Sequence, residues 1–384
     1  MDHGKAQKGE GHLMAYYFKT EKMAVGYEKC PLIENIEICL EKGEILTLIG
    51  PNGAGKSTIL KSFSRQLELI AGVVRLGDFD LSEMSGSDLS KEMSVVLTEK
   101  LQTEMMTCED VVATGRYPYT GRFGLLSEDD YRIIDETMKL VHVDAIRDQD
   151  FTKISDGQRQ RVMLARAICQ EPEIIVLDEP TSYLDVKYKL EFLSILQEMK
   201  RKKGLTVIMS LHELELAERV SDKILCVDGT RADRFGTPEE VFEPGYISKL
   251  FSISTGSFDE KSGTMELQAP EGPAKVFVIA GGGCGKHVYR RLQREGIAFS
   301  AGILFENDVD YPAANALACS VVAASAFEPI TDSMVEEAKH AIDQAEQVIC
   351  CKEKFGSFEK ANEELMNYAK AAGKLVMEPA AAVF

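Results

Sequence analysis

The sequence predicts an α/β protein of two domains, each built on a mostly parallel sheet. Apolar runs that suit strands buried on both faces alternate with stretches of helical spacing along most of the 384 residues. A chain of this length exceeds one ordinary domain. Around residues 255–273 Ser, Gly, Thr, Asp, Glu and Pro dominate, which predicts a linker. We therefore expect one domain at 14–254 and a smaller one at 274–384.

The first domain begins with strands and continues with helices. Ser127, followed by Asp130, has the spacing of a capping box and predicts a helix start within the helical stretch 108–143. Two buried strands come later, with a long helical stretch between them. The expected strands lie at 15–18, 23–27, 33–40, 45–49, 73–76, 93–97, 174–177 and 206–209.

The second domain alternates strands and helices over roughly 110 residues, a size that can fold independently. It opens with an apolar strand, a glycine-rich turn and a helix, which predicts a small Rossmann-like α/β domain. Its expected strands are at 276–280, 299–304, 347–351 and 374–377, and its expected helices are at 286–294, 333–345 and 357–371.

The composition argues against several classes of protein. An apolar fraction of 45% is ample for packed cores, and a net charge of −18 argues against a general nucleic-acid surface. No run reaches the ~18 apolar residues of a membrane span, and the first residues lack the apolar core of a signal peptide, so we expect a cytoplasmic protein. The nine cysteines form no C-x-x-C pair, which predicts reduced thiols.

The first domain is organised around residues 45–58, where a strand, a loop and a helix follow one another. The loop fits G-x-x-x-x-G-K-[ST], the pattern of a phosphate-binding loop. Its glycines let backbone N–H groups point inward around an anion, and the helix adds its positive end. Lys56 would reach the β- and γ-phosphates, and Ser57 would hold Mg²⁺. The sequence thus predicts a nucleoside triphosphate site at Gly50, Asn52, Gly53, Gly55, Lys56, Ser57 and Thr58.

Two further segments have residues that suit phosphate chemistry. Asp178 and Glu179 end a buried strand, where an open α/β sheet presents its ligand crevice, and such acids can hold Mg²⁺ and orient a water. Ser155 and Gln158 have the spacing of a capping box, which exposes N–H groups at a helix start. That segment is either a second anion site or simply a capped helix.

Two aromatic side chains are weaker candidates. His212 follows a third buried strand, and its position in a chain with two phosphate signals favours a role. Tyr27 ends a strand ahead of the loop, so its ring either belongs to the core or stacks on an adenine.

In order and spacing, these segments resemble the ATP-binding subunit of an ABC transporter over residues 14 to about 252. Residues 50–57 match Walker A, and residues 174–179 match Walker B. Residues 155–158 match the family signature, with Asp156 where glycine is commoner. Residues 182–185 resemble the D-loop, His212 resembles the switch histidine, and Tyr27 resembles the adenine-stacking aromatic.

The resemblance implies a P-loop ABC ATPase domain with a β-rich N-terminal part and a helical insert. It also implies a head-to-tail dimer in which each ATP lies between Walker A of one subunit and the signature of the other. The implied roles are phosphate binding by Lys56, Mg²⁺ binding by Ser57 and Asp178, positioning of water by Glu179, sensing of the γ-phosphate by His212, and completion of the partner's site by Ser155, Gly157 and Gln158.

One segment departs from the family pattern. Where a glutamine usually contacts Mg²⁺ and the attacking water, this chain reads Thr98-Glu99. Either residue could replace the glutamine through its oxygen atoms, and Thr98 is a candidate metal ligand.

The stretch from Gly115 to Pro118 narrows the resemblance. It is similar to the Gly-Arg-Tyr-Pro stretch of ATPases that serve importers of iron-siderophores, haem and vitamin B12. The implied partners are a polytopic membrane permease, a second ATPase subunit and, indirectly, an extracytoplasmic substrate-binding protein, which places the chain at the cytoplasmic face of the membrane. The alternative is a soluble ABC ATPase of DNA repair or translation, and the single cassette without sustained heptads favours transport.

The glycine-rich turn of the second domain, Gly281 to Gly285, only partly fits a nucleotide fingerprint. Lys286 or Val288 occupies the third glycine position of G-x-G-x-x-G. We expect a structural turn. Glu306 lies at roughly the spacing of a ribose-binding acid, but the broken fingerprint and the acidity of its loop argue against a polyphosphate. A sensor for a neutral or cationic ligand is therefore one hypothesis, and a passive dimerisation or docking module without a ligand is the other.

Overall fold

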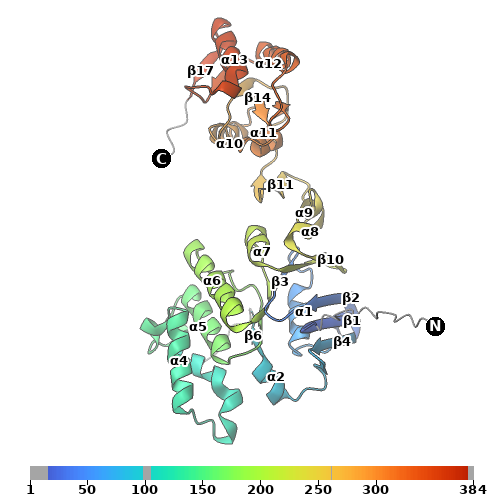
Figure 1. Ribbon diagram of the computed structural model, residues 1–384, viewed down its shortest axis with the longest axis vertical. Helices are drawn as coiled ribbons and strands as arrows, with labels where there is room; N and C mark the ends of the chain where they lie inside the picture. The colour runs from blue at the N-terminus through green and yellow to red at the C-terminus, as the bar shows by residue number, and fades with distance from the viewer. Residues whose placement is uncertain (1–15, 98–104, 261, 379–384) are drawn as a thin grey trace, which may run out of the picture. The chain divides into compact units, whose positions relative to one another are not determined.

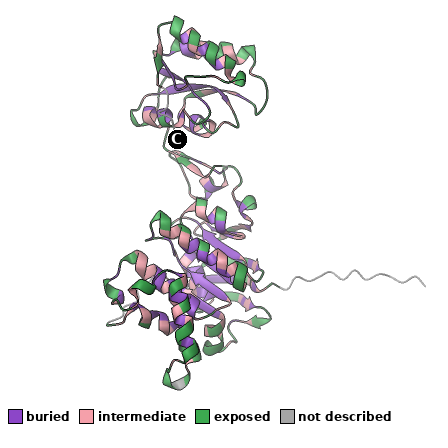
Figure 2. Cartoon of the chain, turned by 60° about the vertical axis from the view of Figure 1, so that its left-hand side comes forward, coloured by how far each residue is buried: buried purple, intermediate pink, exposed green. Residues whose placement is uncertain are grey.

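A computed structural model describes residues 16–97, 105–260 and 262–378 and divides the chain into two compact units, Met1–Glu243 and Pro244–Phe384. Each unit has its own sheets and its own buried core (Figure 1 and Figure 2). Within the expected linker, β11 (Ser257–Asp259) and β12 (Thr264–Glu266) pair as a small antiparallel sheet. The domain bounds expected from composition stay a prediction.

A six-stranded sheet forms the centre of the first unit. Its middle strand, β3 (Ile45–Ile49), runs parallel to both neighbours, β8 (Thr206–Ser210) and β9 (Lys223–Val227). Every residue of β3 and β8 is buried, as their continuous apolar runs predict for strands covered on both faces. The strand order is β10-β9-β3-β8-β7-β6, in which the remaining strands are β6 (Met93–Val96), β7 (Ile174–Leu177) and the antiparallel β10 (Ala232–Gly236).

The N-terminal strands form a separate antiparallel sheet in the order β2-β1-β4-β5. The strand expected at 23–27 is part of a longer strand, β1 (Phe18–Tyr27), whose pairing with β2 (Cys30–Leu40) continues across several shifts of register. Of the strand expected at 15–18, only Phe18 belongs to β1, and residue 15 lies outside the described residues. Phe18 of β1 packs edge-on against Phe63, with ring centroids 5.1 Å apart. The two other strands are β4 (Ala71–Leu76) and β5 (Phe79–Asp80).

The helical insert contains α3 (Cys108–Ala113), α4 (Glu128–Leu140) and α5 (Asp156–Cys169), which contact one another, together with the segments that connect them. Ser127 caps α4 through a capping box with Asp130, as its spacing predicts. Buried Arg116 donates to Asp130 at 2.8 Å and to the Cys169 carbonyl at 2.8 Å, so it ties the segment after α3 to the two longer helices. The helices of this unit are α1 (Lys56–Phe63), α2 (Gly86–Glu92), α3 (Cys108–Ala113), α4 (Glu128–Leu140), α5 (Asp156–Cys169), α6 (Val186–Lys203), α7 (Leu214–Val220) and α8 (Pro238–Val241).

The second unit contains a five-stranded parallel sheet in the order β15-β14-β13-β16-β17. The direction of strand addition reverses between β13 and β16, and open α/β sheets bind ligands beside such a switch point. The Rossmann-like α/β fold expected for this part is confirmed. The strands are β13 (Val276–Ile279), β14 (Phe299–Phe305), β15 (Ser320–Ala324), β16 (Gln347–Cys350) and β17 (Leu375–Met377).

Helices cover both faces of this sheet. Buried residues of α10 and α11 form one core with it, and those of α12 and α13 form another on the opposite face. The alanine-rich stretch that forms α11 and β15 was not identified from the sequence, because alanine gives little periodic contrast. The helices are α9 (Tyr246–Leu250), α10 (Lys286–Arg294), α11 (Tyr311–Leu317), α12 (Asp332–Gln344) and α13 (Lys360–Ala371). In the described ranges of both units, no helix combines the length and apolarity needed to cross a bilayer.

Candidate functional site

The loop between β3 and α1 depends on its glycines. Gly50 has φ 150°, and a Cβ there would lie 2.0 Å from the Val227 carbonyl oxygen, so a larger residue cannot occupy this position without moving β9. Gly53 and Gly55 have φ values of 78° and 95°, which disfavour other residues. The backbone therefore adopts the turn that brings successive N–H groups and the start of α1 to one side.

The Lys56 side chain lies along this loop. Its residue is only 5% exposed, and its Nζ donates to the carbonyl oxygens of Gly50 at 2.7 Å and Pro51 at 2.9 Å. Burial lowers the pKa of Lys56, and the nearby carboxylates of Glu179 and Asp178 partly oppose that shift. A cationic donor is thus held at the mouth of the anion-binding turn.

Two acids follow β7 and share one hydroxyl group. Ser210 Oγ donates a hydrogen bond to buried Asp178 at 2.7 Å. The same Ser210 Oγ accepts a hydrogen bond from the Glu179 N–H at 2.9 Å. Glu179 has φ 49°, a left-handed conformation that is uncommon outside glycine and typical of strained functional positions. A role for Ser210 was not predicted from the sequence. Its signal was a hydroxyl at the end of an otherwise apolar buried strand.

His212 and Glu179 meet directly. His212 Nε2 lies 2.6 Å from Glu179 Oε1, and Ser182 Oγ donates to Glu179 Oε2 at 3.2 Å. These contacts fix the direction of the Glu179 carboxylate. The structure therefore joins the segments after β7 and β8, which are distant in the sequence.

Residues 52–58 of the loop, Glu179 and His212 line one pocket of about 410 Å³, whereas Gly50 and Asp178 are not part of its lining. Tyr27 contributes a ring that is 54% exposed, and its hydroxyl lies 3.2 Å from Thr58 Oγ1. The glycine cradle, one lysine and an accessible hydroxyl match the needs of a nucleoside triphosphate, and the oxygens of Ser57 and Asp178 are of the kind Mg²⁺ prefers. The lining residues are Tyr27, Leu32, Asn52, Gly53, Ala54, Gly55, Lys56, Ser57, Thr58, Glu179 and His212.

The segment 155–158 does not line this pocket. The exposed Ser155 caps α5, its Oγ accepting from the Gln158 N–H at 3.2 Å, while Gln158 Oε1 accepts from the Ser155 N–H at 2.9 Å. The capping box expected here is confirmed. The two halves of the expected ATP site thus remain apart within one chain. Thr98 and Glu99, expected near the metal, lie outside the described residues.

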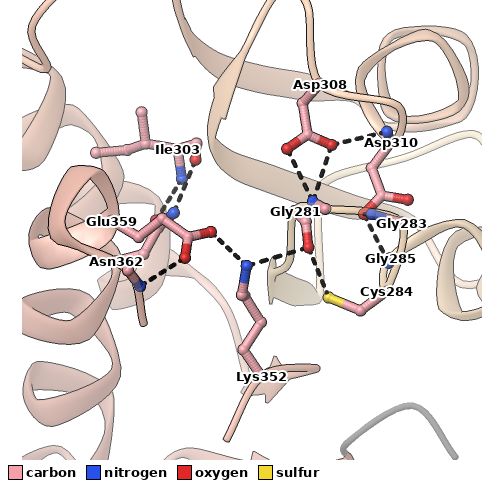
Figure 3. A network of polar contacts seen from close by, with 12 residues as sticks. Gly281, Gly283, Cys284, Gly285, Ile303, Asp308, Asp310, Lys352, Glu359 and Asn362 are labelled. Carbon is pink, nitrogen blue, oxygen red and sulfur yellow. Dashed lines mark hydrogen bonds and ion pairs between the residues drawn. The ribbon is translucent and has the colours of Figure 1, made fainter. Parts of the chain in front are cut away.

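In the second unit, carboxylates of the protein accept hydrogen bonds from the backbone of the glycine turn (Figure 3). Asp308 accepts from the Gly282 N–H at 2.8 Å, and Asp310, which is fully buried, accepts from the N–H groups of Gly283 at 3.1 Å and Gly285 at 2.8 Å. These two acids, rather than Glu306, contact the turn. The N–H groups that could cradle an anion are already bound, in keeping with the structural turn expected from the sequence.

Two families match parts of the sequence. Residues 33–182 match the ABC transporter family, and residues 299–380 match the MJ0874 family. The ABC match contains the phosphate loop, the signature segment and the acids after β7. The second match lies within the second unit.

Three relatives show how far the similarity extends. The uncharacterized ABC transporter ATP-binding protein MJ0873 of Methanocaldococcus jannaschii is 42% identical over 71% of this chain and 95% of its own length. The iron(3+)-hydroxamate import ATP-binding protein FhuC of Bacillus subtilis is 36% identical over 61% of this chain and 87% of its own. The cobalamin import ATP-binding protein BtuD of Halobacterium salinarum is 29% identical over 83% of this chain and 81% of its own. This last alignment is longer than the first unit, so it extends into the second.

Solved structures share the fold of the first unit. An ATP-binding subunit of an ABC transporter is 25% identical with a TM-score of 0.53, and it covers 59% of this chain and 91% of its own. The dimeric, post-hydrolysis ATP-binding cassette MJ0796 with ADP and Pi is 22% identical with a TM-score of 0.52, and it covers 58% of this chain and 98% of its own.

Proposed function

The chain belongs to the ABC transporter family of ATP-binding proteins and is an ATPase. We propose that it powers an importer for a corrinoid or an iron complex. The observation that carries the proposal is the single pocket in which the phosphate loop meets Glu179 and His212, whose side chains lie 2.6 Å apart. The names of the relatives, which specify import of iron(3+)-hydroxamate and of cobalamin, support a metal-containing organic cargo.

The proposed ATP site assigns charge stabilisation to the loop. The N–H groups at the start of α1 and the Lys56 ammonium would face the phosphates, and the Tyr27 ring would stack on the base. Ser57 and Asp178 would hold Mg²⁺, which offsets phosphate charge when bound. Because Ser210 already donates to Asp178 Oδ1, that carboxylate is held in a fixed direction.

Glu179 is the proposed base for the attacking water. Its carboxylate opens into the pocket, and the contacts from His212 and Ser182 limit its rotation. His212 would report the γ-phosphate, because movement of Glu179 toward a water changes the contact between the two side chains. Hydrolysis would then be coupled to the segment that begins α7 (Leu214–Val220).

A dimer would complete the site. Ser155, Gly157 and Gln158 lie outside the pocket of their own chain, yet Ser155 is exposed at the start of the 14-residue helix α5. A second copy placed head to tail would bring this helix start to the γ-phosphate. Since ATP would bind both copies at once, it would favour the closed dimer, and hydrolysis would release it.

The proposed setting is the cytoplasmic face of a membrane, with a polytopic permease as the direct partner. An extracytoplasmic substrate-binding protein would act through that permease, and no nucleic acid would take part. The exposed Tyr117, Tyr131 and Phe123 of the helical insert provide apolar side chains for contact with the permease. Co-purification of the chain with a polytopic membrane protein from its own host tests this setting. Isolation without such a partner favours an ATPase that acts outside transport.

Cargo uptake is the decisive test of the proposed function. We expect the host strain to take up labelled cyanocobalamin or ferrichrome with the wild-type chain and to lose that uptake with Lys56→Ala. Lys91→Ala is the matched control, since this lysine lies at the end of α2, away from the pocket. ATP hydrolysis without uptake of either cargo would reject the cargo class and leave the ATPase assignment intact.

A further inference from the structure

A pocket of about 900 Å³ lies in the second unit at the carboxyl edge of its parallel sheet. Three segments that are distant in the sequence form it, namely the end of β14, the loop between β15 and α12, and the turn that leads into α13. Its volume is near the upper end of the roughly 300–1,000 Å³ typical of small-molecule sites. The lining residues are Phe305, Asn307, Phe327, Glu328, Pro329, Ile330, Gly356, Ser357, Phe358, Glu359, Lys360 and Ala361.

Two phenylalanines that line this pocket are largely exposed to water, which is unfavourable for apolar rings unless another molecule covers them. Phe327 is 91% exposed and Phe358 is 81% exposed. Phe327 also has φ 64°, a left-handed conformation that is a true outlier for a bulky side chain. Neither packing nor backbone preference explains an exposed ring held in that conformation. Strain and exposed apolar surface at the same position are typical of a binding site.

The charged side chains around the pocket offer no excess of positive charge to a strongly anionic ligand. Glu359 accepts hydrogen bonds from Lys352 Nζ and from the Gly356 N–H at 2.9 Å, so its charge is already balanced (Figure 3). Glu328 and Lys360 carry opposite charges. The neighbouring turn adds negative charge, because Asp308 lies within 4 Å of the position that a Gly281 Cβ would take.

The remaining lining favours a large neutral ligand with both rings and amides. Phe305, Phe327 and Phe358 offer aromatic surface, while Asn307 and Ser357 offer hydrogen bonds to amide groups. An iron catecholate is anionic and a haem carries two carboxylates, so both are disfavoured here. A hydroxamate complex can be neutral but lacks extended ring surface. A corrinoid combines a broad macrocycle with amide side chains.

We propose that this pocket binds a corrinoid, with the Phe327 and Phe358 rings against the macrocycle, so that the second unit senses imported cargo. This inference rests on the proposed function, because it assumes that the cargo is the corrinoid of the two classes named there. It assigns ligand binding to a site separate from the ATP site, in a unit whose glycine turn is closed to phosphates. Binding removes the apolar surface of Phe327 and Phe358 from water.

Equilibrium dialysis of the full-length chain against cyanocobalamin, without nucleotide, tests the proposal. We expect micromolar binding, weakened about tenfold or more by the double variant Phe327→Ala/Phe358→Ala. Phe79→Ala is the matched control, because Phe79 is 68% exposed in the first unit and the same side chain is removed. ATP hydrolysis should stay unchanged in all three proteins, since none of these residues lines the ATP pocket.

Several results would overturn the proposal. The proposal fails if no cyanocobalamin binds at ligand concentrations well above the micromolar range. It also fails if the double variant binds cyanocobalamin with the same affinity as the wild type. Tighter binding of haemin than of cyanocobalamin would reject the neutral class. A change in oligomeric state with the double variant, without a change in ligand affinity, would identify the surface as a protein contact instead.

The failure of this inference is distinct from the failure of the proposed function. Cyanocobalamin uptake by the host with no binding in dialysis rejects the pocket and keeps the cargo. ATP hydrolysis with no uptake of cyanocobalamin rejects the corrinoid as cargo, and with it the sensor role. When uptake is intact, its response to corrinoid supply should be lost in the double variant and kept in Phe79→Ala.

Discussion

Two loops in this chain have the same local order of strand, glycine turn and helix, yet they differ in the anion they suit. The first suits an external anion, and the second binds a carboxylate of the protein itself. Each follows a buried strand, turns through glycines and opens a helix with a Gly-Lys pair, Gly55-Lys56 in the first unit and Gly285-Lys286 in the second. The first loop, residues 50–57, borders a pocket of about 410 Å³, and we call it the open loop. In the second, residues 281–286, the Asp310 carboxylate accepts hydrogen bonds from three backbone N–H groups, at 2.8 to 3.1 Å, and we call it the closed loop.

The difference lies in a segment outside either turn. Inward-pointing N–H groups and a helix start attract any anion of suitable size. In the second unit the segment after β14 supplies that anion from within the protein, 25 residues beyond Gly285. The same backbone thus becomes a ligand site or a structural joint, depending on whether a distant carboxylate reaches it.

The first prediction concerns the pocket at the open loop, where we expect the greatest change in the rate of ATP hydrolysis. Glu179→Gln should bind ATP yet hydrolyse it at least about 100-fold more slowly, because the amide cannot take a proton from water. Nucleotide binding and steady-state hydrolysis of the purified chain measure the two properties separately. Glu83→Gln, an exposed glutamate outside the pocket, is the control. Near-normal turnover by Glu179→Gln would remove this residue from the catalytic role.

The second prediction concerns a substitution that removes the carboxylate from the closed loop. Asp310→Ala should lower the free energy of unfolding of the second unit by about 3 kcal/mol, because the turn loses a buried charged acceptor. Inorganic phosphate should then restore part of the loss in the variant and have no such effect on the wild type. Denaturant unfolding with and without phosphate measures both. Asp332→Ala, at an exposed helix start, is the control. If phosphate stabilises both proteins equally, the carboxylate is not what closes the loop.

The third prediction concerns the aromatic neighbour of the open loop. Tyr27→Ala should weaken ATP binding several-fold, since an aromatic contact contributes roughly 0.5–1.5 kcal/mol. Tyr27→Phe keeps the ring and removes only the contact between the hydroxyl and Thr58 Oγ1, so its affinity should remain close to wild type. Titration with a fluorescent ATP analogue compares the two variants. Equal losses in both would assign the effect to the hydroxyl.

The smallest expected effect lies in the closed loop. Cys284 stands where Ala54 stands in the open loop, counted from each Gly-Lys pair. A hydrogen bond with Cys351 lowers the pKa of Cys284 and raises that of Cys351, and burial raises the latter further. Because the Cys284 thiolate forms at lower pH, iodoacetamide should modify Cys284 at lower pH than Cys351, as measured by peptide mass spectrometry.

The variant Cys351→Ala provides the control for this thiol. It removes the hydrogen-bond partner, so the pH at which Cys284 reacts should rise toward the ordinary range of a thiol. Modification of Cys284 at the same pH in both proteins would show that the contact does not govern its reactivity.

The fold class and the local chemistry of the open loop were predictable from the amino-acid sequence. Continuous apolar runs identified β3, β7 and β8, and the spacing of Gly50, Lys56 and Ser57 identified the phosphate-binding turn. These features are readable because burial on both faces and the conformational freedom of glycine act on neighbouring residues. Capping at Ser127 and Ser155 was equally local and was confirmed.

Contacts between groups that are distant in the sequence were not predictable and are seen in the folded chain. Folding brought Ser210 to Asp178, His212 to Glu179 and Asp310 to the second glycine turn. It also brought Phe327 and Phe358 to one pocket from loops that follow different strands. Parallel strands place their carboxyl ends along one edge whatever their separation in sequence, so these contacts depend on strand order and register. Neither quantity is encoded in the spacing of neighbouring residues, and this is why one glycine turn is open while the other is closed.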